Sequence, residues 1–427
     1  MIILLRQCVV SKHVWVEGDV TVIRVRNTSE AMAWIARNYY GAPAEAMQMI
    51  GITGTKGKTT TACMLYQMLK EAGVKCGLIG TLGIRRSDGL KKPGSNTTPD
   101  ALVLQKELRE MADAGCSCCV MEVSSQGLKH YRVEGITFAI GIYTNLSMDH
   151  IGPGEHRSFR EYACCKKRLF ERSRMICINA DDKYHGFMTV NLEAPVYTYG
   201  IEQPCDVKAE HIVYERSSRG LNVTYQTTGW IKDEIVLKMP GTANVYNSLA
   251  AMEAAHLLGI SLETIRKTLR NVSVKGRIEE VRISDKFDVV IDYAHNAASL
   301  ESLIKTLRQY QPKRLVLLFG CGGNRSPLRR FQMGETAGRL SDVTILTSDN
   351  PRYEKPEAIL SDIEQGMKRT KGKYKIIPDR REAISYAISQ AQEGDLIVVA
   401  GKGHEEYQEI EGHFYPMNER EMIENSI

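Results

Sequence analysis

The sequence predicts an α/β protein with two doubly wound domains that follow a short α/β piece. Apolar runs of strand length alternate with segments of helical spacing through most of the chain, which is typical of a parallel sheet covered on both faces. A glycine-rich turn joins one such run to a helix. The pattern then changes register near residues 272–276, where a second series of strands and helices begins. We therefore predict a short first piece at 1–47, a central domain at 48–272 and a C-terminal domain at 273–427.

Size and composition narrow the class of protein. A chain of 427 residues is long for one compact domain, and 43% hydrophobic with 25% charged residues is ordinary for a globular protein. The net charge of +5 is small and its basic residues are dispersed, so we expect no nucleic-acid partner. No apolar run approaches membrane-spanning length, and residues 1–7 are too short for a signal peptide. We expect a cytoplasmic monomer that binds small molecules and no membrane.

The eleven cysteines lie mostly inside apolar runs, and no two Cys-x-x-Cys pairs are spaced for zinc. A chain of this size does not depend on disulfides. We predict buried, reduced thiols.

The first piece contains a strand pattern at residues 20–25 and a helix pattern at 29–40. Thr28 or Ser29 is suited to cap that helix, because both side chains accept hydrogen bonds from the first free N–H groups. A Gly-Ala-Pro break at 41–43 then separates this piece from the next strand.

The sequence Gly-Ile-Thr-Gly-Thr-Lys-Gly-Lys-Thr-Thr-Thr at 51–61 is suited to hold phosphate. Backbone N–H groups and the helix N-terminus would face the anion, Lys58 would add a charge, and Thr59 or Thr60 could hold Mg²⁺. Ile52 stands where the general P-loop pattern has glycine, so the match is to a variant. The alternative is a plain glycine turn before an amphipathic helix, but Gly-Lys-Thr-Thr after a strand favours nucleotide binding.

Predicted strands of the central domain at 75–79, 118–123, 138–143 and 174–179 end in polar clusters, where ligands gather in open α/β sheets. A β-rich excursion follows at 207–237, and a helix starts at 241–247. Glu122 and His150 each follow an apolar strand and suit a second divalent cation. Alternatively, Glu122 caps a helix or pairs with a cation, and His150 has no ligand role.

Four predicted strands of the C-terminal domain, at 289–292, 315–319, 343–347 and 396–400, also end in polar turns. These turns carry Arg325, Asn350, Arg352 and Glu405 among glycines. Arginines recognise carboxylates and a glutamate can hold an ammonium group, so together they resemble a receptor for an amino acid. Any one of these turns alone is better explained as a loop with solvated charges.

Many separate motifs together resemble the Mur ligase family, most closely the MurE type, from about residue 49 to 407. They are Gly-Thr-Lys-Gly-Lys-Thr-Thr, Asn-Thr-Thr-Pro, Met-Glu-Val-Ser-Ser, Thr-Asn-Leu-Ser-Met-Asp-His, Gly-Thr-Ala-Asn-Val-Tyr-Asn-Ser-Leu-Ala-Ala, Gly-Arg-Ile-Glu, Asp-Tyr-Ala-His, Phe-Gly-Cys-Gly-Gly-Asn-Arg, Ser-Asp-Asn-Pro-Arg and Ala-Gly-Lys-Gly-His-Glu. The resemblance implies ATP-dependent amide formation through an acyl phosphate, with ATP and Mg²⁺ as cofactors and ATP held between the central and C-terminal domains.

The resemblance also implies roles for individual residues. Nucleotide-binding residues would be Gly54, Thr55, Lys56, Gly57, Lys58, Thr59, Thr60, Asn244, Arg277, Asp292, His295 and Asn296. Metal ligands would be Thr59, Glu122, His150 and Lys166, the last as a carbamate, and Lys58, Glu122, His150 and Lys166 would be catalytic. The acyl substrate would meet Thr97, Thr98, Ser124, His130 and Arg132. The amino acid would meet Arg325, Asn350, Arg352, Gly401 and Glu405. The selectivity loop of the family reads Asp-Asn-Pro-Arg here, which resembles the loop of enzymes that add meso-diaminopimelate rather than lysine.

The chain departs from the family pattern in several places. The part before the phosphate loop is shorter than the family's UDP-binding domain, and substituted positions are His130, Gln126, Ala297, Ala298 and Ser326. Three hypotheses remain: a ligase adding meso-diaminopimelate to UDP-MurNAc-L-Ala-D-Glu, a related ligase for another carboxylic acid without UDP, and a nucleotide-binding protein without ligase activity.

Overall fold

The structure is a computed structural model that describes residues 7–12, 20–92, 94, 96–152, 154–217 and 220–426. The chain divides into two compact units, which are described separately. The first holds Met1–Ala209, Thr227–Lys232 and Tyr246–Thr268, and the second holds Glu210–Gln226, Asp233–Val245 and Leu269–Ile427. Among the described residues, no helix combines the length and apolarity needed to cross a membrane.

The first piece contains two parallel strands, β1 (Gln7–Val10) and β2 (Thr21–Arg24), then helix α1 (Thr28–Tyr39) and a 3₁₀ turn, Pro43–Ala46. The predicted strand and helix are confirmed, but the predicted cap is wrong. Asn27 is the cap, because its side-chain oxygen accepts hydrogen bonds from the N–H groups of Ser29 and Glu30. Residue 28 already lies inside the helix.

The first unit is built on parallel strands in the order β10-β9-β8-β3-β7-β4. Their bounds are β3 Gln48–Thr53, β4 Cys76–Gly80, β7 Cys118–Glu122, β8 Phe138–Tyr143, β9 Ser173–Asn179 and β10 Val196–Gly200. Short strands β5 (Gly83–Arg85) and β6 (Lys91–Lys92) continue antiparallel beside β4. The four strands predicted here are confirmed to within a residue or so at each end. The predicted β-rich excursion is also confirmed as β11 (Val207–Ser217), β12 (Gly220–Gly229) and β13 (Asp233–Leu237), most of whose residues belong to the second unit.

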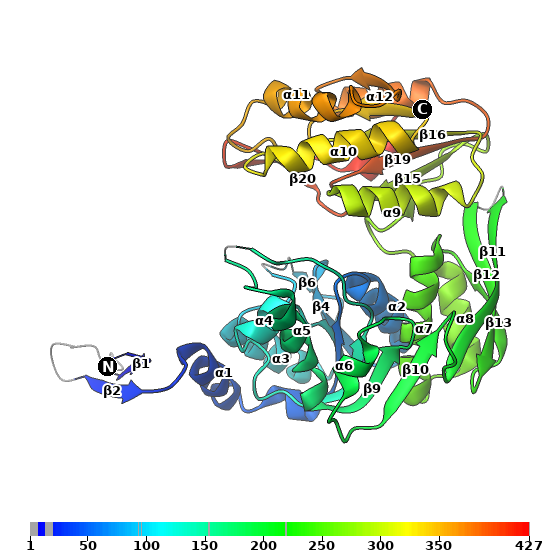
Figure 1. Cartoon of the computed structure of the whole chain (residues 1–427). Coiled ribbons are helices and arrows are strands. Elements are labelled where there is room, and N and C mark those ends of the chain that lie inside the picture. The colour runs from blue at the N-terminus through cyan, green and yellow to red at the C-terminus, as the bar shows by residue number, and fades with distance from the viewer. Residues whose placement is uncertain are drawn as a thin grey trace. The chain divides into compact units, whose positions relative to one another are not determined.

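Helices cover this sheet on both faces, as the apolar runs predict (Figure 1). They are α2 Lys58–Glu71, α3 Ala101–Asp113, α4 Ser125–Lys129, α5 Phe159–Lys167, α6 His185–Thr189, α7 Thr242–Leu257 and α8 Leu262–Asn271, with a 3₁₀ turn at Phe170–Arg172. On one face Met49, Met121 and Ile176 pack in a buried core with residues of α3 and α5. Eight of the eleven cysteines are buried, as predicted, whereas Cys164 is exposed and Cys8 and Cys205 are half-buried.

The second unit contains a second, mainly parallel sheet in the order β14-β15-β19-β16-β17-β18. The strands are β14 Glu279–Glu280, β15 Asp288–Asp292, β16 Arg314–Phe319, β17 Val343–Leu346, β18 Lys373–Ile376 and β19 Asp395–Ala400, and only β14 is antiparallel to its neighbour. Strands β20 (Tyr407–Ile410) and β21 (His413–Pro416) form a separate hairpin. In Figure 1 strands β15, β16 and β19 lie among helices α9 (Ala297–Arg308), α10 (Pro327–Leu340) and α12 (Arg380–Ser389). Helices α11 (Pro356–Met367) and α13 (Glu419–Glu424) complete the unit. The four strands predicted here are confirmed.

A buried ion pair ties the ends of two central strands of this sheet to α13. Arg380 Nε donates to Glu419 Oε1 at 2.6 Å, and the two side chains are 0% and 1% exposed. The other guanidinium nitrogens donate to the carbonyls of Ser348 and Ala400, which follow or end β17 and β19. Arg380 therefore fixes the starting points of two polar turns at the carboxyl edge of the sheet.

Replacing Glu419 by alanine should lower the free energy of unfolding by about 3–5 kcal/mol, because the Arg380 charge would stay buried without its carboxylate. The control is Glu424→Ala on the same helix. Its ion pair with Arg420 is exposed, so removal should cost no more than about 1 kcal/mol. Denaturant unfolding measures both variants, and equal losses would contradict the role given to the buried pair.

Candidate functional site

The phosphate loop lies between the end of β3 and the start of α2. Gly54 has φ +152° and Gly57 has φ +87°, and no side chain caps the first turn of α2, which begins at Lys58. The cap residue Gly57 has no side chain that could accept from the N–H groups at this helix end. Together with the helix dipole they favour an anion such as a phosphate.

Residues that follow β8 hold the loop in place. Thr55 N–H donates to the carbonyl of Asn145 at 2.9 Å, and Lys56 N–H donates to the Asn145 side chain at 3.0 Å. Thr144 Oγ1 donates to the carbonyl of Lys56 at 2.6 Å, and the hydroxyls of Thr55 and Tyr162 are hydrogen-bonded at 2.9 Å. The backbone conformation that an anion requires is thus fixed by neighbouring segments of the same unit.

Thr59 and Glu122, two of the predicted metal ligands, are brought together. Thr59 Oγ1 donates to Glu122 Oε2 at 2.9 Å, while the N–H of Thr81 donates to Glu122 Oε1 at 2.8 Å. Glu122 is 2% exposed, and its hydrogen-bond partners within the described ranges are all uncharged. A buried carboxylate favours a cation as neighbour, and oxygen ligands are what Mg²⁺ prefers, so this pair fits the ion.

Lys166 lies near the loop but is arranged differently. It is 1% exposed, its Nζ donates to the carbonyl of Gly54 at 2.7 Å, and the ammonium lies 4.6 Å from the centre of the Tyr162 ring. Burial, and then the charge of Lys58, lower the pKa of Lys166 well below the usual lysine value. A lowered pKa makes the neutral amine more accessible than in an exposed lysine, and the neutral amine is the form that can react as a nucleophile.

Lys58 also donates to the Gly54 carbonyl, at 2.8 Å, and to the carbonyl of Thr55 at 3.1 Å. The His150 ring centre lies 6.1 Å from that of Tyr162, but His150 is less closely tied to this cluster. Its ring is 46% exposed and Nδ1 lies 3.1 Å from Glu155 Oε1, and no hydrogen bond joins it to Glu122 or Lys166 in the described part of the chain. Across the residues that the structure describes, no three His, Cys, Asp or Glu side chains are grouped to hold a metal.

Four of the five residues predicted to meet an acyl substrate lie close together. Thr98 Oγ1 donates to the carbonyl of Glu122 and accepts from the N–H of Ser124, both at 2.9 Å. Arg132 Nη1 donates to the carbonyl of Thr98 at 2.9 Å, and the hydroxyls of Thr97 and Thr81 are 3.1 Å apart. His130 is exposed at the end of α4.

His156 is a candidate that the sequence did not reveal. Its side chain is fully buried, its ring centre lies 5.2 Å from that of Tyr162, and neither ring nitrogen has a hydrogen-bond partner among the described residues. No spacing or motif signalled this residue, because its burial depends on tertiary contacts such as that with Tyr162.

Several residues predicted to bind nucleotide have local structural contacts in the second unit. Asp292 accepts from the N–H groups of Ile278 and Ala294, and Asn296 caps α9 by accepting from the N–H of Ser299. Both side chains therefore shape their own turns.

Tyr293 contacts two further predicted residues, one through its ring and one through its carbonyl. The guanidinium of Arg277 lies 5.0 Å from the ring centre, and His295 Nδ1 lies 2.8 Å from the Tyr293 carbonyl. Burial lowers the pKa of His295. Asn244, the remaining predicted residue, is buried and donates to the carbonyl of Pro240 at 2.8 Å.

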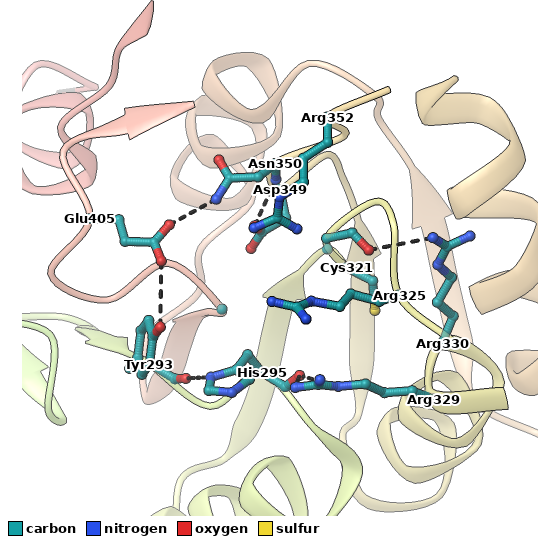
Figure 2. A pocket seen from close by; sticks show the side chains of 13 residues that line it. Tyr293, His295, Cys321, Arg325, Arg329, Arg330, Asp349, Asn350, Arg352 and Glu405 are labelled. Atoms are coloured by element: carbon teal, nitrogen blue, oxygen red, sulfur yellow. Dashed lines mark hydrogen bonds between the residues drawn. The ribbon is translucent and has the colours of Figure 1, made fainter. Parts of the chain in front are cut away.

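All five residues predicted to bind an amino acid line one cavity of about 120 Å³ in the second unit (Figure 2). The turns after β15, β16, β17 and β19 each contribute to its wall, because the carboxyl ends of parallel strands meet at one edge. The predicted residues are Arg325, Asn350, Arg352, Gly401 and Glu405.

Charged groups of both signs face this cavity. Asn350 Nδ2 donates to Glu405 Oε2 at 2.8 Å, and the buried Lys402 donates to Asn350 Oδ1 at 2.9 Å. Burial lowers the pKa of Lys402. Arg330 is 2% exposed and is held by Glu354 and Asp362, so it supports the wall.

Arg325 is the cation most open to a ligand. Figure 2 shows its side chain reaching toward the middle of the cavity. It is exposed and makes no ion pair within the described ranges. The cavity therefore combines an accessible guanidinium with the carboxylate of Glu405, which is suited to a ligand that carries both a carboxylate and an ammonium group.

Comparison with known proteins identifies the class. Residues 52–255 match the model of the Mur ligase middle domain, and residues 276–403 match that of the Mur ligase, glutamate ligase domain. The chain belongs to the Mur ligase family, and the resemblance drawn from its motifs is confirmed.

Individual relatives are similar over nearly the whole chain. UDP-N-acetylmuramoyl-L-alanyl-D-glutamate--2,6-diaminopimelate ligase of Caldanaerobacter subterraneus subsp. tengcongensis is 43% identical over 96% of this chain and 84% of its own length. The enzyme of that name from Geobacillus kaustophilus is 40% identical with the same coverage. A solved structure of that name is 31% identical, with a TM-score of 0.70 over 96% of this chain and 84% of its own. Mycobacterium tuberculosis folylpolyglutamate synthase, 18% identical with a TM-score of 0.70, shares the fold.

The conformation of Gly57 leads to a prediction. Alanine there should weaken ATP binding by about tenfold or more, because a Cβ would lie 2.3 Å from Asn247 Oδ1 and force the loop or the Asn247 side chain to move. The control is Gly73→Ala after the other end of α2, since Gly73 has φ +79° but open space around it. Both variants should lose about 1 kcal/mol of stability from the left-handed backbone. Calorimetric titration with ATP measures the difference, and unchanged affinity in Gly57→Ala would contradict the assignment.

Proposed function

We propose that this protein is an ATP-dependent ligase that adds meso-diaminopimelate to UDP-MurNAc-L-Ala-D-Glu in peptidoglycan precursor synthesis. The names of relatives with about 40% identity over nearly the whole chain support this reaction. The observation that carries the choice of amino acid is the cavity in the second unit. Diaminopimelate has a second carboxylate and a second ammonium group, which match the guanidinium groups of Arg325 and Arg352 and the carboxylate of Glu405.

The first unit would activate the acyl substrate. A substrate carboxylate oxygen attacks the γ-phosphorus of ATP, the bond to ADP breaks, and an acyl phosphate forms. Lys58 and the N–H groups at the start of α2 would stabilise the charge on the transferring group. Mg²⁺, when bound, supplies further positive charge at this step, and Thr59 with Glu122 would hold it.

The second unit would present the amine. Its nitrogen attacks the acyl carbon, the carbon–oxygen bond to phosphate breaks, and the nitrogen loses a proton as the amide forms. Binding the far end of the amino acid between cationic and anionic groups leaves its reacting amine free, which is how positioning assists such a step.

Lys166 would act as a carbamate. The neutral amine attacks CO₂, a nitrogen–carbon bond forms, and one proton is released, which leaves a carboxylate on the side chain. The lowered pKa of Lys166 supports this reaction, because only the unprotonated amine can react. The product would supply an oxygen ligand to the ion that Thr59, Glu122 and His150 would also hold.

Lys166→Ala should reduce ligation by about a hundredfold or more, since a charged ligand of the transferring centre is lost. Lys167→Ala is the control, because the adjacent Lys167 donates to the Val190 carbonyl and lies over the Phe187 ring, away from the phosphate loop. Phosphate release with all three substrates measures both variants. Full activity of Lys166→Ala without added bicarbonate would contradict the carbamate.

The proposed reaction is tested by incubating the protein with ATP, Mg²⁺, UDP-MurNAc-L-Ala-D-Glu and meso-diaminopimelate. We expect ADP release that requires both other substrates, and a product whose mass has grown by one diaminopimelate residue. ATP binding without turnover would contradict the proposal and favour a ligase for a different carboxylic acid. The same assay in the presence of other acids would then identify that class.

A further inference from the structure

The hairpin β20–β21 is attached to the turn that carries Asn350 and Arg352. Arg352 N–H donates to the carbonyl of Glu409 at 3.0 Å, and a parallel bridge pairs Arg352 with Ile410. Gln408 Nε2 donates to the carbonyl of Asp349 at 2.7 Å. The hairpin thus pairs with the turn through one β-bridge, although β20 and β21 form a two-stranded sheet of their own.

Arg352 has a backbone conformation that is unusual for its residue type. Its φ of +53° lies in the left-handed region, which costs a residue with a Cβ about 1–2 kcal/mol. Such conformations persist where surrounding contacts hold them, and they are frequent in ligand-binding turns. The bonds to the hairpin supply those contacts here.

The side chain of Arg352 is held in addition to its backbone. Nε donates to Glu409 Oε2 at 2.9 Å, and Nη1 donates to the carbonyl of Gly323 at 2.9 Å. Because the guanidinium is planar, fixing two of its nitrogens fixes the plane of the group. Nη2 remains for a ligand, and Figure 2 shows the guanidinium beside Asp349 at the cavity.

The hairpin also sets the orientation of Asn350. Its Oδ1 accepts from the N–H of Glu409 at 2.9 Å and from Lys402 Nζ at 2.9 Å. Since both neighbours are donors, the oxygen of the amide must face them. The Nδ2 group therefore points to Glu405, where it donates at 2.8 Å.

We propose that Glu409 is a positioning residue for amino-acid selectivity, which acts by holding Arg352 in the plane that receives the second carboxylate of the amino acid. This inference rests on the proposed function. Glu409 is not among the residues that line the cavity, so it acts through Arg352 rather than by touching the substrate. The hairpin is then the element that distinguishes an amino acid with a terminal carboxylate from one without.

A purely electrostatic role for Glu409 predicts the opposite effect. If its charge only weakened the field of Arg352, removing that charge would strengthen binding of a carboxylate. If Glu409 positions Arg352, removing it frees the guanidinium to rotate and weakens binding. The sign of the change in KM therefore separates the two roles.

Glu409→Gln should raise the KM for meso-diaminopimelate by about tenfold, which corresponds to about 1.4 kcal/mol. The KM values for ATP and the acyl substrate should stay within about twofold, which also shows that the variant is folded. The preference for diaminopimelate over L-lysine should fall. Glu409→Asp keeps the charge on a shorter side chain. Its KM for meso-diaminopimelate should lie between those of the wild type and Glu409→Gln.

The matched control is Glu411→Gln on the same hairpin. The Glu411 side chain is exposed and makes no hydrogen bond or ion pair within the described ranges, so its loss should leave every KM within about twofold.

A double-mutant cycle makes the test specific. In the Arg352→Ala background, Glu409→Gln should change the KM for diaminopimelate by less than about twofold, because the group that Glu409 positions is gone. A tenfold change in that background, or a lower or unchanged KM in Glu409→Gln alone, would overturn the inference. Wild-type protein without activity on diaminopimelate would instead overturn the proposed function, and this inference with it.

Discussion

The carbonyl oxygen of Gly54 is the point on which the first site depends, because it accepts hydrogen bonds from both Lys58 and Lys166. One lysine begins α2 and the other lies on α5, so a single acceptor joins two helices to the phosphate loop. Burial lowers the pKa of Lys166, and the charge of Lys58 at the same acceptor lowers it further. The same arrangement therefore shapes the loop and helps to lower the pKa of Lys166.

Both sites follow from the geometry of parallel sheets. The carboxyl ends of parallel strands lie at one edge, so turns that are far apart in the sequence become neighbours. In the second unit four such turns enclose one cavity, and most of the charges around it are already neutralised within the protein: Arg330 by Glu354 and Asp362, Arg352 by Glu409, and Glu405 by Lys402. Arg325 remains open to a ligand. Because most other charges around the cavity are paired, its guanidinium is suited to recognise a carboxylate.

The sequence alone predicted the strands and the residues at their ends, because strands buried on both faces appear as uninterrupted apolar runs. It also predicted that Arg325, Asn350, Arg352 and Glu405 would share one edge. It did not reveal Lys402 or Glu409 as partners of those residues, since their contacts depend on how the hairpin folds back. The burial of His156 was missed for the same reason, and the cap at Asn27 was missed because three adjacent residues were all suitable acceptors.

Selective recognition of an amino acid with two charged ends is the central claim, and competition tests it most directly. The protein would be given meso-diaminopimelate and L-lysine at equal concentrations, with ATP, Mg²⁺ and UDP-MurNAc-L-Ala-D-Glu, and the two products counted by mass spectrometry. The account predicts that the diaminopimelate product dominates at all times. Equal amounts of both products, or an excess of the lysine product, would contradict it.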